Sequence, residues 1–288
     1  MVGDYMWILF AFLAALFAGI TAILVKLGVS DIDVDVATSI RTTIILIFNF
    51  IIFLFVGDFN EIKEISTTTL VFIILSGITT ALLWLSYFKA LQLGNVNEVT
   101  PIDKTSTVLT LILSAIFLGE AITVVKVISI ILTLTGTYMM IIRSNEKSSN
   151  KKWIIYAILT AILTSFATIL GKIGIKDIEF TLGITIRTLI VFIIIWIVVL
   201  IKKKGYQIKN IKSKSWLFLS LSGITTGLSW FFYFKALQVG EASVVFPIEK
   251  LSIVVTIIFS SIVLKEKLNL KSIIGLIVLV VGTVILII

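Results

Sequence analysis

Two short motifs carry charged side chains where the sequence is otherwise almost wholly apolar, and each begins with one of the chain's two prolines. They are PIDK at Pro101–Lys104 and PIEK at Pro247–Lys250. A proline inside a helix leaves one backbone carbonyl without an amide partner. Within a membrane such a break is tolerated only where protein or water satisfies the carbonyl. The two motifs therefore predict a pair of interrupted helices that face a central cavity.

The charges in these motifs suit the binding of a small polar molecule. Lys104 and Lys250 offer charge-assisted hydrogen bonds to a carboxylate, whereas Asp103 and Glu249 offer them to a cation. Ionisable side chains within membrane spans normally face the bundle interior or water and mark a substrate path. The alternative is a lysine that extends its ammonium to the lipid headgroups. We favour the cavity for both pairs.

Two aromatic pairs are further candidates for substrate contact: Trp84 with Tyr87, and Trp230 with Tyr233. A spacing of three residues places each pair on one face of a helix. Tryptophan and tyrosine also gather at the two membrane–water interfaces. An interfacial aromatic belt is therefore the alternative to a binding surface.

Four more cations lie within apolar segments and are candidates for gating. Arg41 and Arg187 occupy the equivalent motifs SIRT and TIRT, while Lys89 and Lys235 occupy two copies of YFKAL. An arginine is costly to leave unpaired within a membrane span. We therefore expect ion pairs that form and break alternately at two gates, with helix bends at the two prolines. For the two lysines the alternative is an anchor at a helix end.

All of these residues come in pairs because the chain is one sequence written twice, 146 positions apart. Ser76–Gly94 reads SGITTALLWLSYFKALQLG and Ser222–Gly240 reads SGITTGLSWFFYFKALQVG, with 14 of 19 residues identical. The same offset relates Glu120 to Glu266 without a gap. A long-period repeat of this kind indicates an architecture built from two equivalent units.

The composition is that of a membrane protein. Of the 288 residues, 59% are hydrophobic and 14% are charged, and the mean hydropathy is +1.17, far outside soluble usage. Apolar runs of about 20 residues are long enough to cross roughly 30 Å of hydrocarbon. Ten such runs are predicted, at about 6–25, 35–56, 68–92, 97–119, 122–142, 153–171, 181–201, 215–238, 243–264 and 270–288.

Ten spans divide into five for each repeat, and an odd number makes the second copy enter the membrane from the opposite side. The expected fold is an all-α membrane protein with ten transmembrane helices in two inverted five-helix repeats. The first repeat is assigned to 1–143, a basic linker to 144–151 and the second repeat to 152–288.

Several kinds of chemistry lack the residues that they need. The chain has no cysteine and no histidine, so thiolate chemistry and the commonest metal ligand and general base are missing. No glycine-rich phosphate loop ending in lysine and serine or threonine is present. The formal charge of +8 lies mainly in short loops between spans, which indicates membrane topology rather than nucleic-acid binding. We expect no enzyme activity, no cofactor and no metal site.

The repeated block resembles the drug/metabolite transporter superfamily, specifically its EamA branch. The resemblance rests on a proline followed by a polar pair and on spans that end in LGE at Leu118–Glu120 or LKE at Leu264–Glu266, and it covers essentially the whole chain. It implies a polytopic carrier that moves small metabolites, often amino acids, and commonly outward. The second half also resembles the five-span members of the branch, which implies that the chain is a fused pair.

The predicted function is secondary-active transport of a small polar metabolite, an amino acid or another carboxylate, by alternating access. The carrier is expected in the lipid bilayer as a monomer or homodimer, with a proton or another ion as the candidate coupling species. One alternative is export of cationic or drug-like amphiphiles, held by Asp103 or Glu249 and stacked on the tryptophans. An alternative of another class is a non-transporting membrane scaffold or an accessory of a lipid flippase.

Loop charge yields a prediction about orientation. The loops after the fifth, seventh and ninth spans carry 13 lysines and arginines, against at most four on the side of the termini. Basic loops stay in the cytoplasm, so both termini should lie outside it, although ten-span members of the EamA branch commonly keep theirs inside. A C-terminal reporter that works only outside the cytoplasm should be active. Activity of a cytoplasm-only reporter would show that the family habit outweighs loop charge.

Overall fold

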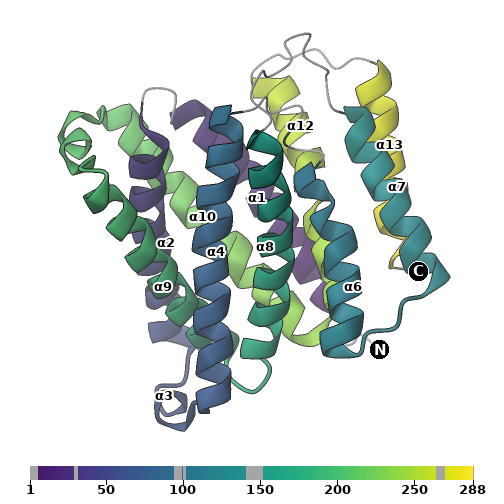
Figure 1. The fold of residues 1–288 in the computed structure, drawn as a ribbon, viewed down its shortest axis with the longest axis horizontal. Helices are drawn as coiled ribbons and strands as arrows, with labels where there is room; N and C mark the ends of the chain where they lie inside the picture. The colour runs from purple at the N-terminus through teal and green to yellow at the C-terminus, as the bar shows by residue number, and fades with distance from the viewer. Residues whose placement is uncertain are drawn as a thin grey trace.

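The computed structural model describes residues 6–28, 32–93, 99, 102–140, 152–263 and 270–287, and every regular element in these ranges is a helix (Figure 1). The helices are α1 (Met6–Gly28), α2 (Val34–Val56), α3 (Glu61–Glu64), α4 (Thr67–Leu93), α6 (Ser106–Leu118), α7 (Val124–Met140), α8 (Lys152–Gly174), α9 (Phe180–Ile201), η1 (Gly205–Asn210), α10 (Ser213–Val239), α11 (Ala242–Glu249), α12 (Ser252–Val263) and α13 (Leu270–Ile285).

Within the described residues, seven helical segments are long and apolar enough to cross a membrane: Met6–Val25, Val34–Val56, Thr67–Leu91, Lys152–Gly174, Phe180–Ile201, Ser213–Val239 and Ala242–Phe259. Helical structure is expected there because lipid offers no partner to a backbone amide or carbonyl, and a helix pairs these groups internally. Val124–Met139 and Leu270–Ile285 are apolar but shorter. An all-helical protein with several membrane spans is confirmed, while the count of ten stays a prediction.

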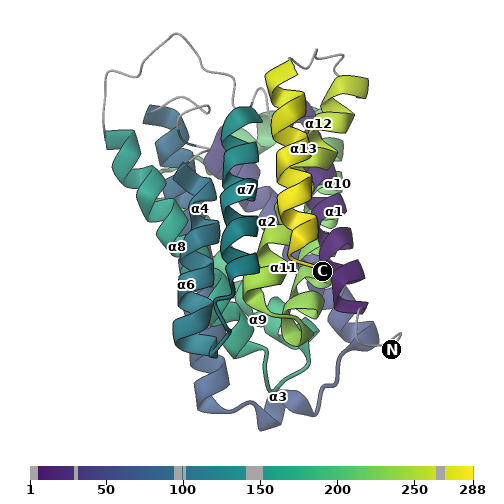
Figure 2. The same cartoon turned by 90° about the vertical axis from the view of Figure 1, so that its right-hand side faces the viewer.

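The helices of the two copies interlock across the molecule. By the 146-residue offset α1, α2, α4, α6 and α7 correspond to α8, α9, α10, α12 and α13. α4 packs on α8 and α9, and in the same way α10 packs on α1 and α2. α7 lies beside its own counterpart α13 and runs in the opposite direction (Figure 2). These contacts join helices of one half to helices of the other, so neither half packs as a separate body.

One membrane segment that carries a proline is interrupted, but the break lies beyond the proline rather than at it. Pro247 lies inside α11, and α12 begins only after a turn at Lys250 and Leu251. The turn is tightened by amides that donate three residues back, such as that of Leu251 to the carbonyl of Ile248 at 3.0 Å. The equivalent amide in the first copy, that of Thr105, makes the same kind of bond at 3.0 Å. Pro101 lies outside the described residues.

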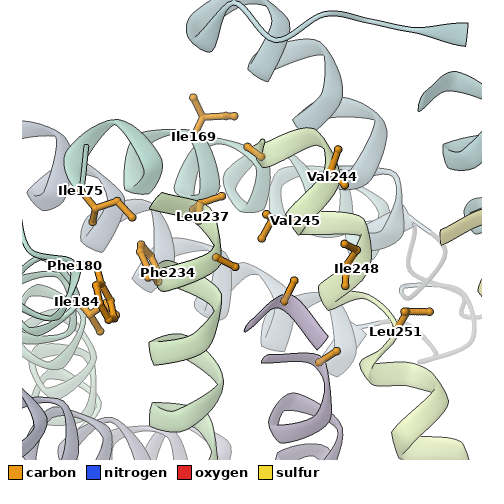
Figure 3. Close-up of a cluster of buried hydrophobic side chains, with 14 of the residues drawn as sticks. Ile169, Ile175, Phe180, Ile184, Phe234, Leu237, Val244, Val245, Ile248 and Leu251 are labelled. Carbon is orange, nitrogen blue, oxygen red and sulfur yellow. The ribbon is translucent and has the colours of Figure 1, made fainter. Parts of the chain in front are cut away.

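The half-helix α11 packs within the largest apolar cluster of the described residues. Its buried side chains, among them Val245 and Ile248, pack against Phe234 and Leu237 of α10 (Figure 3). Every residue from Ala242 to Ile248 is buried. This packing fixes where α11 ends, and its C-terminal end carries the charged pair of the PIEK motif.

Glycines let α7 and α13 approach closely. A Cβ added at Gly136 would lie 2.5 Å from the carbonyl oxygen of Gly275 and 2.5 Å from the amide nitrogen of Leu279. The equivalent Gly282 faces α7 in the same way, 2.7 Å from Cβ of Leu132. Small residues at such contacts are the usual device for tight packing of helices in a membrane.

Gly136→Ala should therefore lower the thermal stability of the purified protein, because the added methyl meets backbone atoms that cannot move aside. Overpacking of this kind costs about 1–3 kcal/mol. The matched control is Gly205→Ala in η1, where an added Cβ has no atom within 4 Å. Equal melting temperatures of the two variants would contradict the close contact of α7 with α13.

Candidate functional site

A cavity of about 310 Å³ lies between α1, α2, α4, α8, α9, α10 and α11, within the size range of small-molecule sites. Twelve of its lining residues form six repeat-equivalent pairs: Ala18 and Thr164, Thr21 and Ala167, Arg41 and Arg187, Thr80 and Thr226, Leu83 and Ser229, and Trp84 and Trp230. The cavity is therefore built by both copies, at the place where they meet.

Each cavity arginine reaches across to the other repeat. Arg41 Nη2 donates to Thr226 Oγ1 at 3.0 Å, and Arg187 Nη2 donates to Thr80 Oγ1 at 2.8 Å. Thr80 and Thr226 are also equivalent by the repeat, so the two hydrogen bonds are equivalent contacts in the two copies. Arg187 also donates from Nε to Ser76 Oγ at 3.1 Å. The SGITT sequence that the copies share thus supplies the acceptors for the arginines of the SIRT and TIRT motifs.

The hydroxyls can accept from the arginines because their own protons are engaged elsewhere. Thr80 donates to the carbonyl of Ser76 at 2.7 Å, and Thr226 donates to that of Ser222 at 2.7 Å. The helices come close enough because a glycine follows each of these serines. An added Cβ at Gly77 would lie 3.0 Å from the backbone oxygen of Arg187.

No acid neutralises either arginine within the part of the chain that the structure describes. Arg187 is 7% exposed, and its hydrogen bonds go to hydroxyls only. Arg41 Nε and Arg187 Nη1 are buried without a hydrogen-bond partner. The guanidinium of Arg187 lies 4.7 Å from the ring centre of Trp230 and 4.8 Å from that of Phe234. Such contacts attract a cation but leave its charge in place.

The PIEK pair forms another part of the cavity wall. Lys250 Nζ lies 3.0 Å from Glu249 Oε2 and 4.2 Å from the ring centre of Phe246. In the PIDK motif Lys104 Nζ lies 3.7 Å from Asp103 Oδ2. Lys104 lines a separate cavity of about 290 Å³ against α7. Although their sequences are equivalent, only the second pair contributes to the shared cavity as described.

Three of the four aromatic candidates line the cavity, and the fourth, Tyr87, does not. The rings of Trp84 and Trp230 lie 5.7 Å apart at 34°, and both line the cavity with Tyr233, whose hydroxyl is 3.4 Å from Thr168 Oγ1. Tyr87 instead packs beside Phe88 and against a buried cluster of Ala90, Val99 and Ala157. The tryptophans thus contact the cavity rather than a lipid interface.

Two predicted gating lysines lie away from the cavity lining. Lys89 is exposed. Lys235 points its ammonium at three phenylalanine rings, those of Phe10 at 4.7 Å, Phe180 at 5.9 Å and Phe231 at 5.8 Å. Aromatic faces stabilise a cation by about 0.5–2 kcal/mol, so Lys235 joins α1, α9 and α10.

A charged network joins the loop after α6 to the end of α8 and the start of α11, at the end of the helix bundle where α1 begins and α13 ends (Figures 1 and 2). Lys172 Nζ donates to Glu120 Oε1 at 3.0 Å and to the carbonyl of Gly240 at 2.6 Å. Glu120 accepts from the amides of Ala242 at 2.7 Å and Ser243 at 2.9 Å, at the start of α11. Nearby, Lys126 pairs with Glu241 at 2.5 Å.

Glu120 remains ionised in this network. Burial by itself raises the pKa of its carboxyl group, but the charge of Lys172 and the amides of Ser243 and Ala242 lower it by more, so the net pKa lies below its usual value. A carboxylate at a helix N-terminus also interacts favourably with the helix dipole. The acid of the first copy thereby caps a half-helix of the second.

Comparison with known proteins relates both halves to one family. The sequence profile of the EamA-like transporter family matches residues 5–142 and again residues 151–288. A protein of a Sinorhizobium species, described as an uncharacterized transporter in the cobO 3′ region, is 35% identical over 137 residues, which are 48% of this chain and 97% of that protein. An uncharacterized protein of Methanocaldococcus jannaschii is 29% identical over 133 residues, 46% of this chain and 94% of its own length.

A solved structure shares the fold across the full length. Its TM-score is 0.79 at 15% sequence identity, and the alignment covers 98% of this chain and 96% of that one. At this identity the likeness concerns the helical architecture alone. The two relatives by sequence each have about half the length of this chain, which corresponds to a single repeat.

Arg187→Met should leave the melting temperature of the ligand-free protein unchanged or raise it. The change removes a buried cation that has no acidic partner, while Thr80 keeps its bond to a backbone carbonyl. The matched change Lys172→Met should lower the melting temperature, since Glu120 loses its counter-ion. Equal losses in the two variants would identify Arg187 as a structural anchor instead of a ligand-binding group.

Proposed function

This chain belongs to the EamA-like transporter family, and on that basis we propose that it is a secondary-active carrier of a small polar metabolite that bears a carboxylate, such as an amino acid. The observation that carries the proposal is the pair of cavity arginines, which have no acidic partner in the described part of the chain. In a water-poor site, a carboxylate would gain charge-assisted hydrogen bonds from guanidinium groups. The ligand would supply the counter-ion that the described residues do not.

The two alternatives fit the cavity less well. A cationic amphiphile would need a free carboxylate, but Glu249 is already engaged by Lys250 at 3.0 Å, and the two arginines would repel the ligand. A scaffold would gain nothing from two cations in the cavity wall that lack an acidic partner among the described residues and so cost stability. Both features favour an anionic ligand.

Alternating access is the mechanism that the duplicated architecture favours. We propose that the two halves are inverted repeats of five spans each, which is consistent with the opposite course of α7 and α13 in Figure 2 and with relatives that have the length of one repeat. Exchange of the two halves' conformations would turn a cavity open to one side into one open to the other.

The network around Glu120 is our candidate for one of the gates. It joins the loop after α6 to the end of α8 and the start of α11, and therefore ties together segments of both repeats. The 146-residue offset assigns the equivalent roles to Glu266 and Lys26, whose side chains lie outside the described residues. We propose that one network forms as the other breaks. Arg41 and Arg187, which we expected to act at gates, would then contact the substrate.

The gate makes a prediction that labelling can test. Glu120→Gln should weaken closure at the termini end, because a lost hydrogen bond to a charged group is worth about 1.5–3 kcal/mol, which corresponds to about tenfold or more in the equilibrium. In this chain without natural cysteine, Ala18→Cys in the cavity wall should then react faster with a membrane-impermeant thiol reagent from that side. The control is Glu64→Gln in the exposed helix α3. Equal labelling of both variants would contradict the gate.

The proposed function itself is tested by ligand binding to the purified protein. Carboxylate metabolites should raise the melting temperature of the wild type, as ligands of the folded state do by mass action, and should be taken up by proteoliposomes. Arg41→Gln and Arg187→Gln should lose both responses, whereas Lys63→Gln in α3 should keep them. Stabilisation and uptake of cationic compounds, with none for carboxylates, would overturn the proposal in favour of the cation exporter.

A further inference from the structure

We infer that the substrate of the central cavity is a dianion with two separated negative groups, a small dicarboxylate, and that Arg41 binds one group while Arg187 binds the other. The inference rests on the proposed function and narrows its substrate class. It concerns two side chains that are equivalent by the repeat, lie in different halves of the protein and line one cavity.

The charges of the cavity wall favour a ligand that carries two negative charges. The lining residues that carry a charge at neutral pH are Arg41, Arg187, Lys250 and Glu249. Glu249 and Lys250 neutralise each other at 3.0 Å, so the two arginines leave a net charge of two. A monocarboxylate would leave the buried Arg187 or the partly buried Arg41 unpaired, which is costly for a cation shielded from water. An amino-acid zwitterion would add a cation for which no free acid lines the cavity as described.

The hydrogen-bond donors divide between the arginines in the same manner. Each guanidinium is steadied by a threonine of the opposite repeat, Arg41 by Thr226 at 3.0 Å and Arg187 by Thr80 at 2.8 Å. Each retains one buried nitrogen without a partner, Nε in Arg41 and Nη1 in Arg187. Unsatisfied buried donors in a folded protein call for an explanation, and a ligand with an acceptor group at each end provides it for both.

The remaining wall suits the carbon chain of such a molecule. Trp84 and Trp230 contribute apolar ring surface from the two repeats, and their ring centres are 5.7 Å apart. A ligand with two similar ends and an apolar middle has the same approximate two-fold symmetry as its site. Such a ligand would bridge the repeats, and each end could stay on its own arginine while the halves rearrange.

The test compares dicarboxylates with monocarboxylates of equal carbon number. Malonate, succinate, glutarate and adipate would be measured against propionate, butyrate, valerate and hexanoate, with glycine, alanine and inorganic phosphate as further probes, by thermal shift and by quenching of tryptophan fluorescence. One dicarboxylate should bind at least tenfold more tightly than its monocarboxylate. Arg41→Gln and Arg187→Gln should each abolish that preference, Arg187→Lys should retain part of it, and Lys63→Gln should leave it unchanged.

The outcomes separate this inference from the proposed function. Equal or tighter binding of monocarboxylates or amino acids would overturn the dianion while leaving a carboxylate carrier in place. Tightest binding of phosphate, with no effect of dicarboxylate length, would also overturn it, because one compact anion would then occupy the site. If the wild type binds no carboxylate at all, both the dianion inference and the proposed function are overturned. The wild-type series alone distinguishes these results, so a variant that fails to fold does not prevent a decision.

Discussion

The arrangement of the protein centres on two arginine side chains between the repeats, Arg187 buried and Arg41 partly buried, neither of which has an acidic partner among the described residues. Burying an ion costs several kcal/mol unless a counter-charge and hydrogen bonds compensate it. Threonine hydroxyls at 2.8 and 3.0 Å offset part of that cost for Arg187 and Arg41, respectively, and the ring of Trp230 offsets a further part for Arg187. What remains uncompensated is the part that an anion can remove. The retention of this cost in a cavity of about 310 Å³ is the basis for the binding site that we propose.

The duplication explains how one chain builds this site. The serine and glycine of SGITT allow α4 to approach α9 and α10 to approach α2, which brings each arginine within reach of the other repeat's threonine. The interrupted segment of α11 and α12 then brings the charged end of a half-helix to the same cavity. Glu120 caps the other end of α11 and couples its position to the first repeat. The proposed binding site and the proposed gate thus share one element.

Sequence patterns anticipated the helices, the repeat and the paired arginines, because hydropathy and identity are local properties. They did not anticipate that hydroxyls of the opposite repeat, rather than acids, hold Arg41 and Arg187, since that depends on how the helices pack. A sequence repeat also cannot reveal where the two copies differ in structure. Lys250 and Tyr233 line the cavity and their equivalents Lys104 and Tyr87 do not, because the two copies adopt different arrangements in one conformation. The α11 cap by Glu120 is likewise a contact between distant segments.

A carboxylate fixed beside one arginine tests the central claim most directly. Thr80→Asp would place an acid where a hydroxyl now lies 2.8 Å from Arg187 Nη2, and Thr80→Asn would keep the shape without the charge. If an anionic ligand is the missing counter-ion, the aspartate variant should melt at a higher temperature than the asparagine variant without ligand, and should no longer be stabilised by carboxylates. A lower melting temperature for the aspartate variant, with carboxylate binding intact, would contradict the role assigned to the arginines.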